Sequence, residues 1–214
     1  MIAADDVVRR CWRDIAGPGH EHTADLLVGR HAEPHRRYHT AEHVRWVLHH
    51  ITNLIAVEVA MDDVDVDALR AAALFHDVVY DPQSPTNEAD SAAIAGRALA
   101  ELGWSTERLR SVRDLVLATA SHEADTPAAA VLLDADLAVL GAEPPDYRTY
   151  VDGVRSEYGF VDEAAWRTGR AAVLRSFLDR DRIYATASMV AAREQPARRN
   201  LGDELASLVS DGVR

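Results

Sequence analysis

The chain has 214 residues, of which 48% are hydrophobic, and this content suffices for a folded globular core. Its formal net charge of −12 argues against binding DNA or RNA through a broad basic face. No run approaches ~20 consecutive apolar residues, and acids stand where a secretory signal would be apolar, so we expect a cytoplasmic protein that does not contact membranes. The single cysteine, Cys11, excludes intramolecular disulfides and thiolate metal clusters, which leaves His, Asp and Glu as candidate metal ligands.

The spacing of apolar residues predicts helices along most of the chain, and no alternating β-branched run indicates a strand. We therefore predict an all-α fold. The first clear helix runs from Ala41 to Ala60, with Thr40 as its N-cap. A second helix runs from Asp65 to Tyr80, and the prolines of the following DPQSP stretch end it.

The rest of the chain is also predicted to be helical. Further helices are expected from Asn87 to Leu102, from Ser105 to His122, through the central AAAVLLDADLAVLG stretch that closes at Gly141 as a C-cap, from Tyr147 to Tyr158, from Glu163 to Arg180, and through a Glu- and Arg-rich C-terminal segment. We find no internal repeat, linker or shift of composition, so residues 1–214 are interpreted as a single domain.

An adjacent histidine and aspartate, His76 and Asp77, lie inside the apolar stretch LFHDVVY. Burying an unpaired carboxylate costs several kcal/mol, so Asp77 requires water or a cationic partner, which could be an arginine, a histidine imidazolium or a metal ion. On a helix the two side chains would project about 100° apart, so they could converge only on an ion beside the helix flank between them.

Two further acids are unusual because they interrupt the central apolar stretch. Asp136 has leucine or valine at its four neighbouring helical positions, and Asp134 is nearly as enclosed. A salt bridge or a helix cap would explain either acid alone, whereas both acids together with Asp77 indicate a shared positive centre. The RRYHTAEH stretch supplies nitrogen ligands, since His39 and His43 lie one turn apart at the mouth of a predicted helix. Four other histidines are interpreted as surface residues: His20, His22, His49 and His50.

In chain order, His39, the His76–Asp77 pair and Asp136 resemble the H…HD…D signature of the HD-domain superfamily of metal-dependent phosphohydrolases. The stretches EPHRRYHTAEH, ALFHDVVYDPQSPTNEADSA and EQPARRNLGDEL are similar to a small bacterial branch described as predicted metal-dependent HD phosphohydrolases. The resemblance implies one HD-type helical bundle over residues 1–214. It also implies one divalent ion at the centre of that bundle, held by His39, His76, Asp77 and Asp136, with Asp136 preferred to Asp134 because the family pattern places the ligand in an AD pair before an apolar helix.

The resemblance further implies hydrolysis of a phosphoester of a small phosphorylated metabolite or nucleotide by a metal-activated water. The ion would be Mn, Fe, Co, Ni, Mg or Zn, and a homodimer is one option for the assembly. Asp77 and Glu88 are the predicted catalytic residues, with Glu88 as a candidate general base. Arg36 or Arg37 is predicted to clamp a substrate phosphate. Two histidines, His43 and His122, are predicted to line the substrate pocket.

One departure from the family pattern limits this interpretation. Family members with two metals carry two further histidines between the His-Asp pair and the last aspartate, whereas this chain has only His122 there. We therefore expect one ion. The alternatives are a dinuclear-iron HD oxygenase and a non-catalytic protein that binds metal or nucleotide without turnover.

Overall fold

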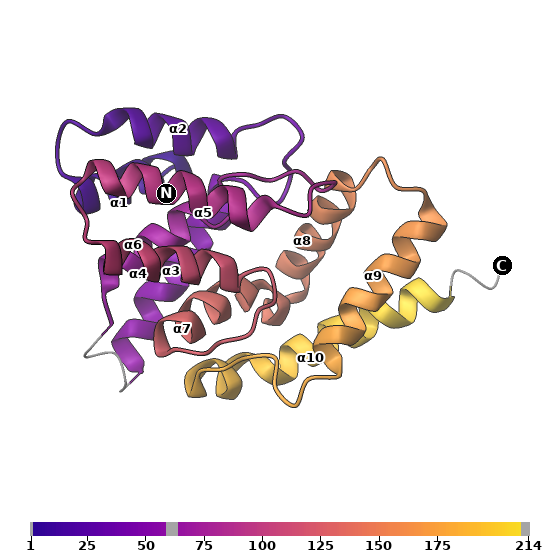
Figure 1. Cartoon of the computed structure of the whole chain (residues 1–214). Coiled ribbons are helices and arrows are strands. Elements are labelled where there is room, and N and C mark those ends of the chain that lie inside the picture. Colours follow the sequence, from indigo (N-terminus) through magenta and orange to yellow (C-terminus); the bar gives the residue numbers. More distant parts are fainter. Residues whose placement is uncertain (1, 59–63, 211–214) are drawn as a thin grey trace. The chain divides into compact units, whose positions relative to one another are not determined.

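The structure is a computed structural model that describes residues 2–58 and 64–210. Within these ranges it contains ten α-helices, one short 3₁₀ helix, η1, and no strand, which confirms the predicted all-α fold (Figure 1). The chain divides into two compact units, Met1–Asp136 and Leu137–Arg214. The single domain over residues 1–214 stays a prediction.

The first unit is built around α4, whose residues from Ala71 to Phe75 are all buried. A helix that is apolar on every side must be covered on every side, and α4 packs against α1, α3, α5, α6 and α7. The helices of this unit are α1 (Ala4–Ala16), α2 (Glu21–His31), α3 (Ala41–Val57), α4 (Val66–Phe75), α5 (Asn87–Glu101), α6 (Thr106–Ala118) and α7 (Pro127–Asp136).

The helices predicted from Ala41 onward are found in this unit, though not with every predicted boundary, whereas α1 and α2 were not predicted. Helix α3 ends at Val57, and the last two residues of the predicted Ala41–Ala60 helix lie outside the described residues. Helix α4 ends at Phe75, so the predicted continuation to Tyr80 is wrong. Thr40 precedes α3 as predicted, but its side chain makes no capping hydrogen bond. The side chain of Ser105 does cap α6, because it accepts a hydrogen bond from the backbone N–H of Arg108.

The second unit contains η1 (Leu137–Gly141), α8 (Pro144–Glu157), α9 (Glu163–Leu178) and α10 (Ala187–Ser210). Here η1 packs against α8 and α10, and α9 packs against α10. A Cβ atom on Gly141 would lie 2.7 Å from Cβ of Arg193 and 2.8 Å from its carbonyl oxygen. The prediction of one helix that closes at Gly141 is wrong, because α7 ends at Asp136 and the 3₁₀ helix η1 follows it. Gly141 ends η1, and the glycine is needed for the close approach of α10 rather than for a left-handed cap.

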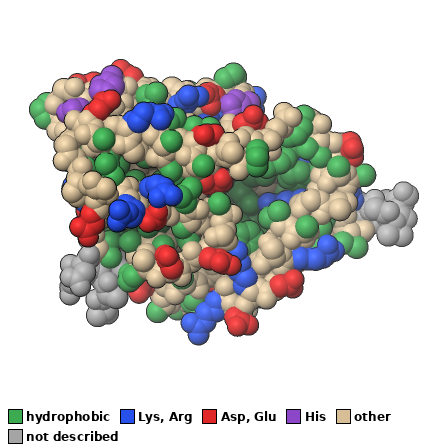
Figure 2. Space-filling view, viewed as in Figure 1, with side chains coloured by type: hydrophobic (Ala, Val, Ile, Leu, Met, Phe, Trp, Pro, Cys, Tyr) green, Lys and Arg blue, Asp and Glu red, His purple; other side chains and the backbone are tan. Residues whose placement is uncertain are grey.

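The described helices and their surface are compatible with the exclusions drawn from composition. None of the described helices is both long and apolar enough to cross a membrane. On the face shown in Figure 2, acidic and basic side chains of the described residues are interspersed with apolar ones.

Candidate metal centre

The His76–Asp77 pair lies at the end of α4 rather than inside a helix. The backbone N–H of His76 still bonds to the carbonyl oxygen of Ala72 at 2.9 Å, and the N–H of Val78 bonds only three residues back, to Phe75 at 3.1 Å. Because the chain turns here, the two side chains are released from the 100° helical offset. The Nε2 atom of His76 lies 3.1 Å from Oδ2 of Asp77, so both side chains face one point.

Two side chains that are distant in the sequence form hydrogen bonds with the backbone just after α4. The guanidinium of Arg36 donates hydrogen bonds to the carbonyl oxygens of Asp77 at 2.6 Å and Val78 at 3.2 Å. The hydroxyl of Ser91, which is fully buried on α5, accepts a hydrogen bond from the N–H of Val79 at 3.0 Å. These contacts satisfy polar groups that a longer helix would have paired internally, and they account for the early end of α4.

Three helices bring four potential ligands together. His43 lies in the first turn of α3, and its Nε2 atom is 3.1 Å from Nε2 of His76 and 3.5 Å from Oδ2 of Asp77. Asp136 ends α7, and its Oδ1 atom lies 3.0 Å from His43 and 3.6 Å from His76. Among the described residues, His43, His76 and Asp77 form a group whose ligand atoms all lie within 4.8 Å of one another. We call His43, His76, Asp77 and Asp136 the His–Asp cluster.

Neighbouring groups fix the orientation of the cluster side chains. The Nδ1 atom of His76 lies 2.9 Å from the carbonyl oxygen of Ala73, which can only accept, so Nδ1 carries a proton and the lone pair of a neutral ring is at Nε2, facing the cluster. The Nε2 atom of His122 lies 3.1 Å from Oδ2 of Asp136 and holds that carboxylate from its other side. His122 itself has a φ of 53°, a left-handed conformation that is uncommon outside glycine and concentrates at functional sites.

The cluster is a favourable place for positive charge. Burial alone would lower the pKa of His76, but the carboxylates of Asp77 and Asp136 raise it well above its ordinary value. Burial alone would raise the pKa of Asp77, but His76 lowers it strongly. Burial would likewise raise the pKa of Asp136, and hydrogen bonds from His122, His43 and His76 lower it far below its ordinary value. Both acids are therefore ionised at neutral pH, facing protonated His76 when no metal is bound.

The donor set and its spacing fit a single divalent ion. Ligands ~2.1 Å from one ion at angles of ~90–110° lie roughly 3.0–3.4 Å from each other, which is close to the separations found here. Two imidazole nitrogens and two carboxylates, with no thiolate, suit hard or borderline divalent ions. The side chains of Asp77 and Asp136 are 20% and 14% exposed, whereas that of His43 is only 2% exposed, so the carboxylate side of the cluster is open to solvent.

The structure places His43, and not the predicted ligand His39, in the group of possible ligands. His39, a predicted ligand, lies just before α3 with its ring stacked on that of Tyr80 at 4.0 Å between centroids. Its ring centroid is 5.8 Å from that of His43, which was predicted to line the substrate pocket and instead lies in the cluster. The sequence already indicated that His43 faces the interior, because His43 shares the buried stripe of α3 with Val44 and Val47.

The other predicted site residues have varied surroundings. Arg36 has a fully buried side chain whose donors meet protein acceptors, so it does not offer a free phosphate clamp. Arg37 is exposed and donates to the carbonyl oxygens of Pro34 and Arg36. Glu88 is half-buried in the first turn of α5, and none of the hydrogen bonds or ion pairs found within the described chain joins it to the cluster. His50, predicted to lie on the surface, is buried on α3.

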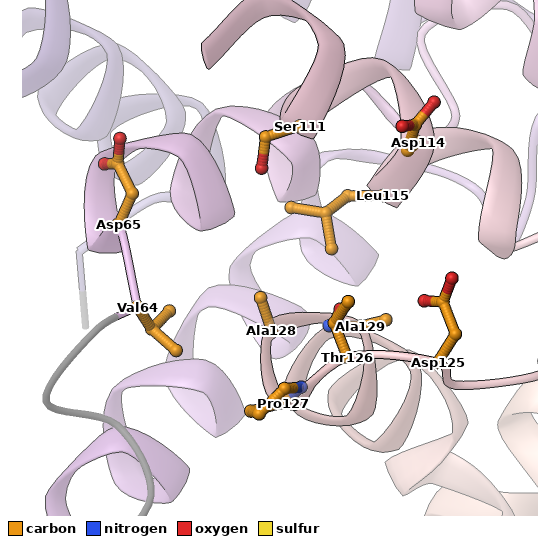
Figure 3. Close-up of a pocket in the computed structure, with 10 residues that line it drawn as sticks. All are labelled: Val64, Asp65, Ser111, Asp114, Leu115, Asp125, Thr126, Pro127, Ala128 and Ala129. Carbon is orange, nitrogen blue, oxygen red and sulfur yellow. The ribbon is translucent and has the colours of Figure 1, made fainter. Parts of the chain in front are cut away.

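The same unit also contains a hollow of about 440 Å³, which is not lined by the His–Asp cluster (Figure 3). The Asp125 carboxylate points toward Asp114 across its rim, and the Asp65 carboxylate binds Arg108 at 2.5 and 2.9 Å. Its lining includes no residue of the His–Asp cluster and no histidine, and comprises Val64, Asp65, Ser111, Asp114, Leu115, Asp125, Thr126, Pro127, Ala128 and Ala129. The cluster, not this hollow, is the candidate site.

Comparison with known families agrees with the position of the cluster. A family model described as HD domain matches residues 40–149, just over half of the chain. The matched range contains every residue of the His–Asp cluster and begins directly after His39. No curated protein and no solved structure matched the chain.

Proposed function

Since this chain belongs to the HD-domain family, we propose that it is a metal-dependent phosphohydrolase acting on a phosphoester of a small phosphorylated metabolite or nucleotide. Members of this superfamily are commonly metal-dependent phosphohydrolases. The observation that carries the proposal is the convergence of two imidazole Nε2 atoms, 3.1 Å apart, with two carboxylates, each of which lies 3.0 to 3.6 Å from both imidazoles, at a point partly open to solvent.

In this proposal His43, His76, Asp77 and Asp136 hold one divalent ion. His43 takes the ligand position that the sequence resemblance assigned to His39. Bound there, the ion would polarise a phosphoryl oxygen and lower the pKa of a water molecule to near neutrality. The carbonyl of Ala73 keeps Nε2 of His76 available as a ligand, and His122 keeps Asp136 turned toward the cluster.

Two residues are proposed to move protons. Oδ2 of Asp77 faces both histidines, which leaves Oδ1 of this partly exposed carboxylate to accept a proton from the attacking water. His39 is half-buried beside the cluster without belonging to its group of ligands, so its imidazole is proposed to donate a proton to the leaving oxygen. Glu88, the other base predicted from sequence, is the weaker candidate because the structure gives it no link to the cluster.

The test compares metal content and turnover in matched variants. We expect about one transition metal ion in the native chain, and its loss in His43→Ala, His76→Ala and Asp136→Ala. His49→Ala is the control, because His49 is an exposed histidine on the same helix and should leave metal content unchanged. The native protein loaded with that ion is then screened for release of phosphate from small phosphorylated compounds and nucleotides.

The outcomes separate the proposal from its alternatives. Phosphate release that follows metal content across the variants supports the phosphohydrolase. Iron near two per chain with oxygen consumption would identify an oxygenase, and metal with ligand binding but no turnover would identify a binding protein. A native chain that takes up no manganese, cobalt or nickel would exclude the metal centre altogether.

A further inference from the structure

Arg36 is the most completely enclosed cation near the candidate site. It lies between α2 and α3, and its side chain is 0% exposed. Its Nε atom donates to Oε2 of Glu33 at 3.1 Å, and Nη1 donates to the carbonyl oxygen of His39 at 3.1 Å. Nη1 and Nη2 also donate to the carbonyl oxygens of Asp77 and Val78, at 2.6 and 3.2 Å. Four N–H donors of one rigid group therefore meet protein acceptors.

The three carbonyl oxygens bound by Arg36 belong to two segments that carry the cluster. The carbonyl of His39 lies directly before α3, whose first turn bears His43. The carbonyls of Asp77 and Val78 belong to the turn that follows α4 and contains a ligand. One planar guanidinium thus joins backbone segments some 40 positions apart in the chain.

The charge of Arg36 is matched without help from a substrate. A buried guanidinium requires a partner, because an unpaired buried charge is strongly destabilising. Glu33 supplies that partner and is itself held by Arg30 at 3.0 Å through its other carboxylate oxygen. The contacts of Arg36 are thus explained by protein groups alone.

We infer that Arg36 is a positioning residue, which sets the spacing of the metal ligands by fastening the His39 backbone to the Asp77–Val78 turn. This inference rests on the proposed metal centre. A planar fork with fixed directions suits the role, whereas a lysine ammonium is a point charge on a flexible stem and cannot reproduce all the bonds. Groups that orient metal ligands typically contribute 10–100-fold to metal affinity or activity.

The second unit offers a matched control in Arg198. Its Nε atom donates to Glu194 at 2.7 Å, and its Nη atoms donate to the carbonyl oxygens of Leu178 at 2.9 Å, Arg180 at 2.7 Å and Asp181 at 3.1 Å. The pattern of one carboxylate and three carbonyls is the same as for Arg36. The carbonyls held by Arg198 lie at the end of α9 and just after it, and none belongs to a proposed ligand or its neighbour.

The experiment measures Mn²⁺ affinity by electron paramagnetic resonance and the visible spectrum of bound Co²⁺ in folded native protein, Arg36→Lys, Glu33→Gln and Arg198→Lys. We expect Arg36→Lys to raise the Kd for Mn²⁺ by ~10–100-fold and to alter the Co²⁺ spectrum. Glu33→Gln should raise the Kd less, because Arg36 keeps its carbonyl partners. Arg198→Lys should lower thermal stability and leave both metal measurements at the native values.

Each outcome decides between the inference and the proposed function. If native protein binds neither ion, the metal centre fails and the inference fails with it. If native protein binds Mn²⁺ but folded Arg36→Lys shows a native Kd and Co²⁺ spectrum, the inference alone is overturned. An equal loss of affinity in Arg198→Lys would also overturn it, because general loosening would then explain the effect. Should Arg36→Lys fail to fold, Glu33→Gln decides the matter by the same criteria.

Discussion

Each unit of the molecule buries a polar cluster, and the two clusters are organised in opposite ways. In the second unit, Arg170 donates from Nε and Nη2 to both oxygens of Glu204, at 2.7 and 3.0 Å, and from Nη1 to the hydroxyl of Tyr150 at 3.1 Å. The hydroxyl of Tyr147 donates to the same carboxylate. One cation faces one anion, and these donors all have acceptors, as expected of a network that stabilises a fold.

In the first unit the imidazoles and carboxylates of the cluster converge on one point instead of forming separate donor–acceptor pairs. The Nε2 atoms of His43 and His76 face each other at 3.1 Å, and two ionised carboxylates point at the same place. Without a metal, a proton on His76 must compensate this charge. The comparison teaches that burial and polarity alone do not distinguish a structural network from a site, whereas the convergence of lone pairs does.

The largest expected effect follows from removing the negative charge of Asp77, one of the proposed metal ligands. Asp77→Asn keeps the shape of the side chain but weakens a ligand and removes the proposed proton acceptor, so we expect loss of stoichiometric metal and ~10²–10⁴-fold lower kcat/KM. Elemental analysis and steady-state kinetics measure the two effects. Native metal content together with native activity in this variant would break the assignment of the site.

The opposite result is expected at the structural cluster. Arg170→Met leaves Glu204 buried without its cation, which should destabilise the protein by ~3–5 kcal/mol while metal affinity in the folded protein is unchanged. Denaturant unfolding and Mn²⁺ titration measure these quantities. Replacing both partners, as Arg170→Met with Glu204→Leu, should recover part of the stability, and a double variant less stable than the single one would contradict this reading.

A smaller effect is expected from the residue that orients Asp136. His122→Asn removes the imidazole but tolerates the left-handed backbone at this position, so stability should change little. We expect metal affinity to fall ~10–100-fold because Asp136 loses the group that holds Oδ2. Titration with Mn²⁺ checks this, with His49→Asn as the control, and an unchanged Kd would remove His122 from the site.

The smallest expected effect is the release of protons when the ion binds. The pKa of His76 is raised while those of Asp77 and Asp136 are lowered, so of these three groups His76 is the one that carries a proton at pH 7 that an ion must displace. Affinity should therefore increase with pH, by up to about tenfold per unit, until the pH passes the pKa of His76. Calorimetry in buffers of different ionisation enthalpy should show about one proton released per ion bound, and no release would contradict the charge state of the cluster.

Local sequence patterns predicted the helices from α3 onward and singled out the His76–Asp77 pair, since apolar periodicity and a charged dipeptide in an apolar run are visible without a structure. The helices α1 and α2 were not predicted. Local patterns could not locate the end of α4, because no glycine or proline follows Phe75 directly and the turn depends on Arg36, 41 positions before Asp77. The burial of Arg36 could not be predicted for the same reason, because two of its hydrogen-bond acceptors, the carbonyl oxygens of Asp77 and Val78, are far away in the sequence. The apolar stripe of α3 already placed His43 on the inner side of the helix, which favours His43 over His39 as the proposed ligand.

The unequal exposure of the ligands has a kinetic consequence. An ion that approaches from solvent meets the oxygens of Asp77 and Asp136, 20% and 14% exposed, before the imidazole of His43, 2% exposed. If the proposed ion binds here, the two carboxylates would be the ligands that it could reach from solvent, and the imidazole of His43 would complete the site from the buried side. Loading and chelation would then not require the protein to unfold.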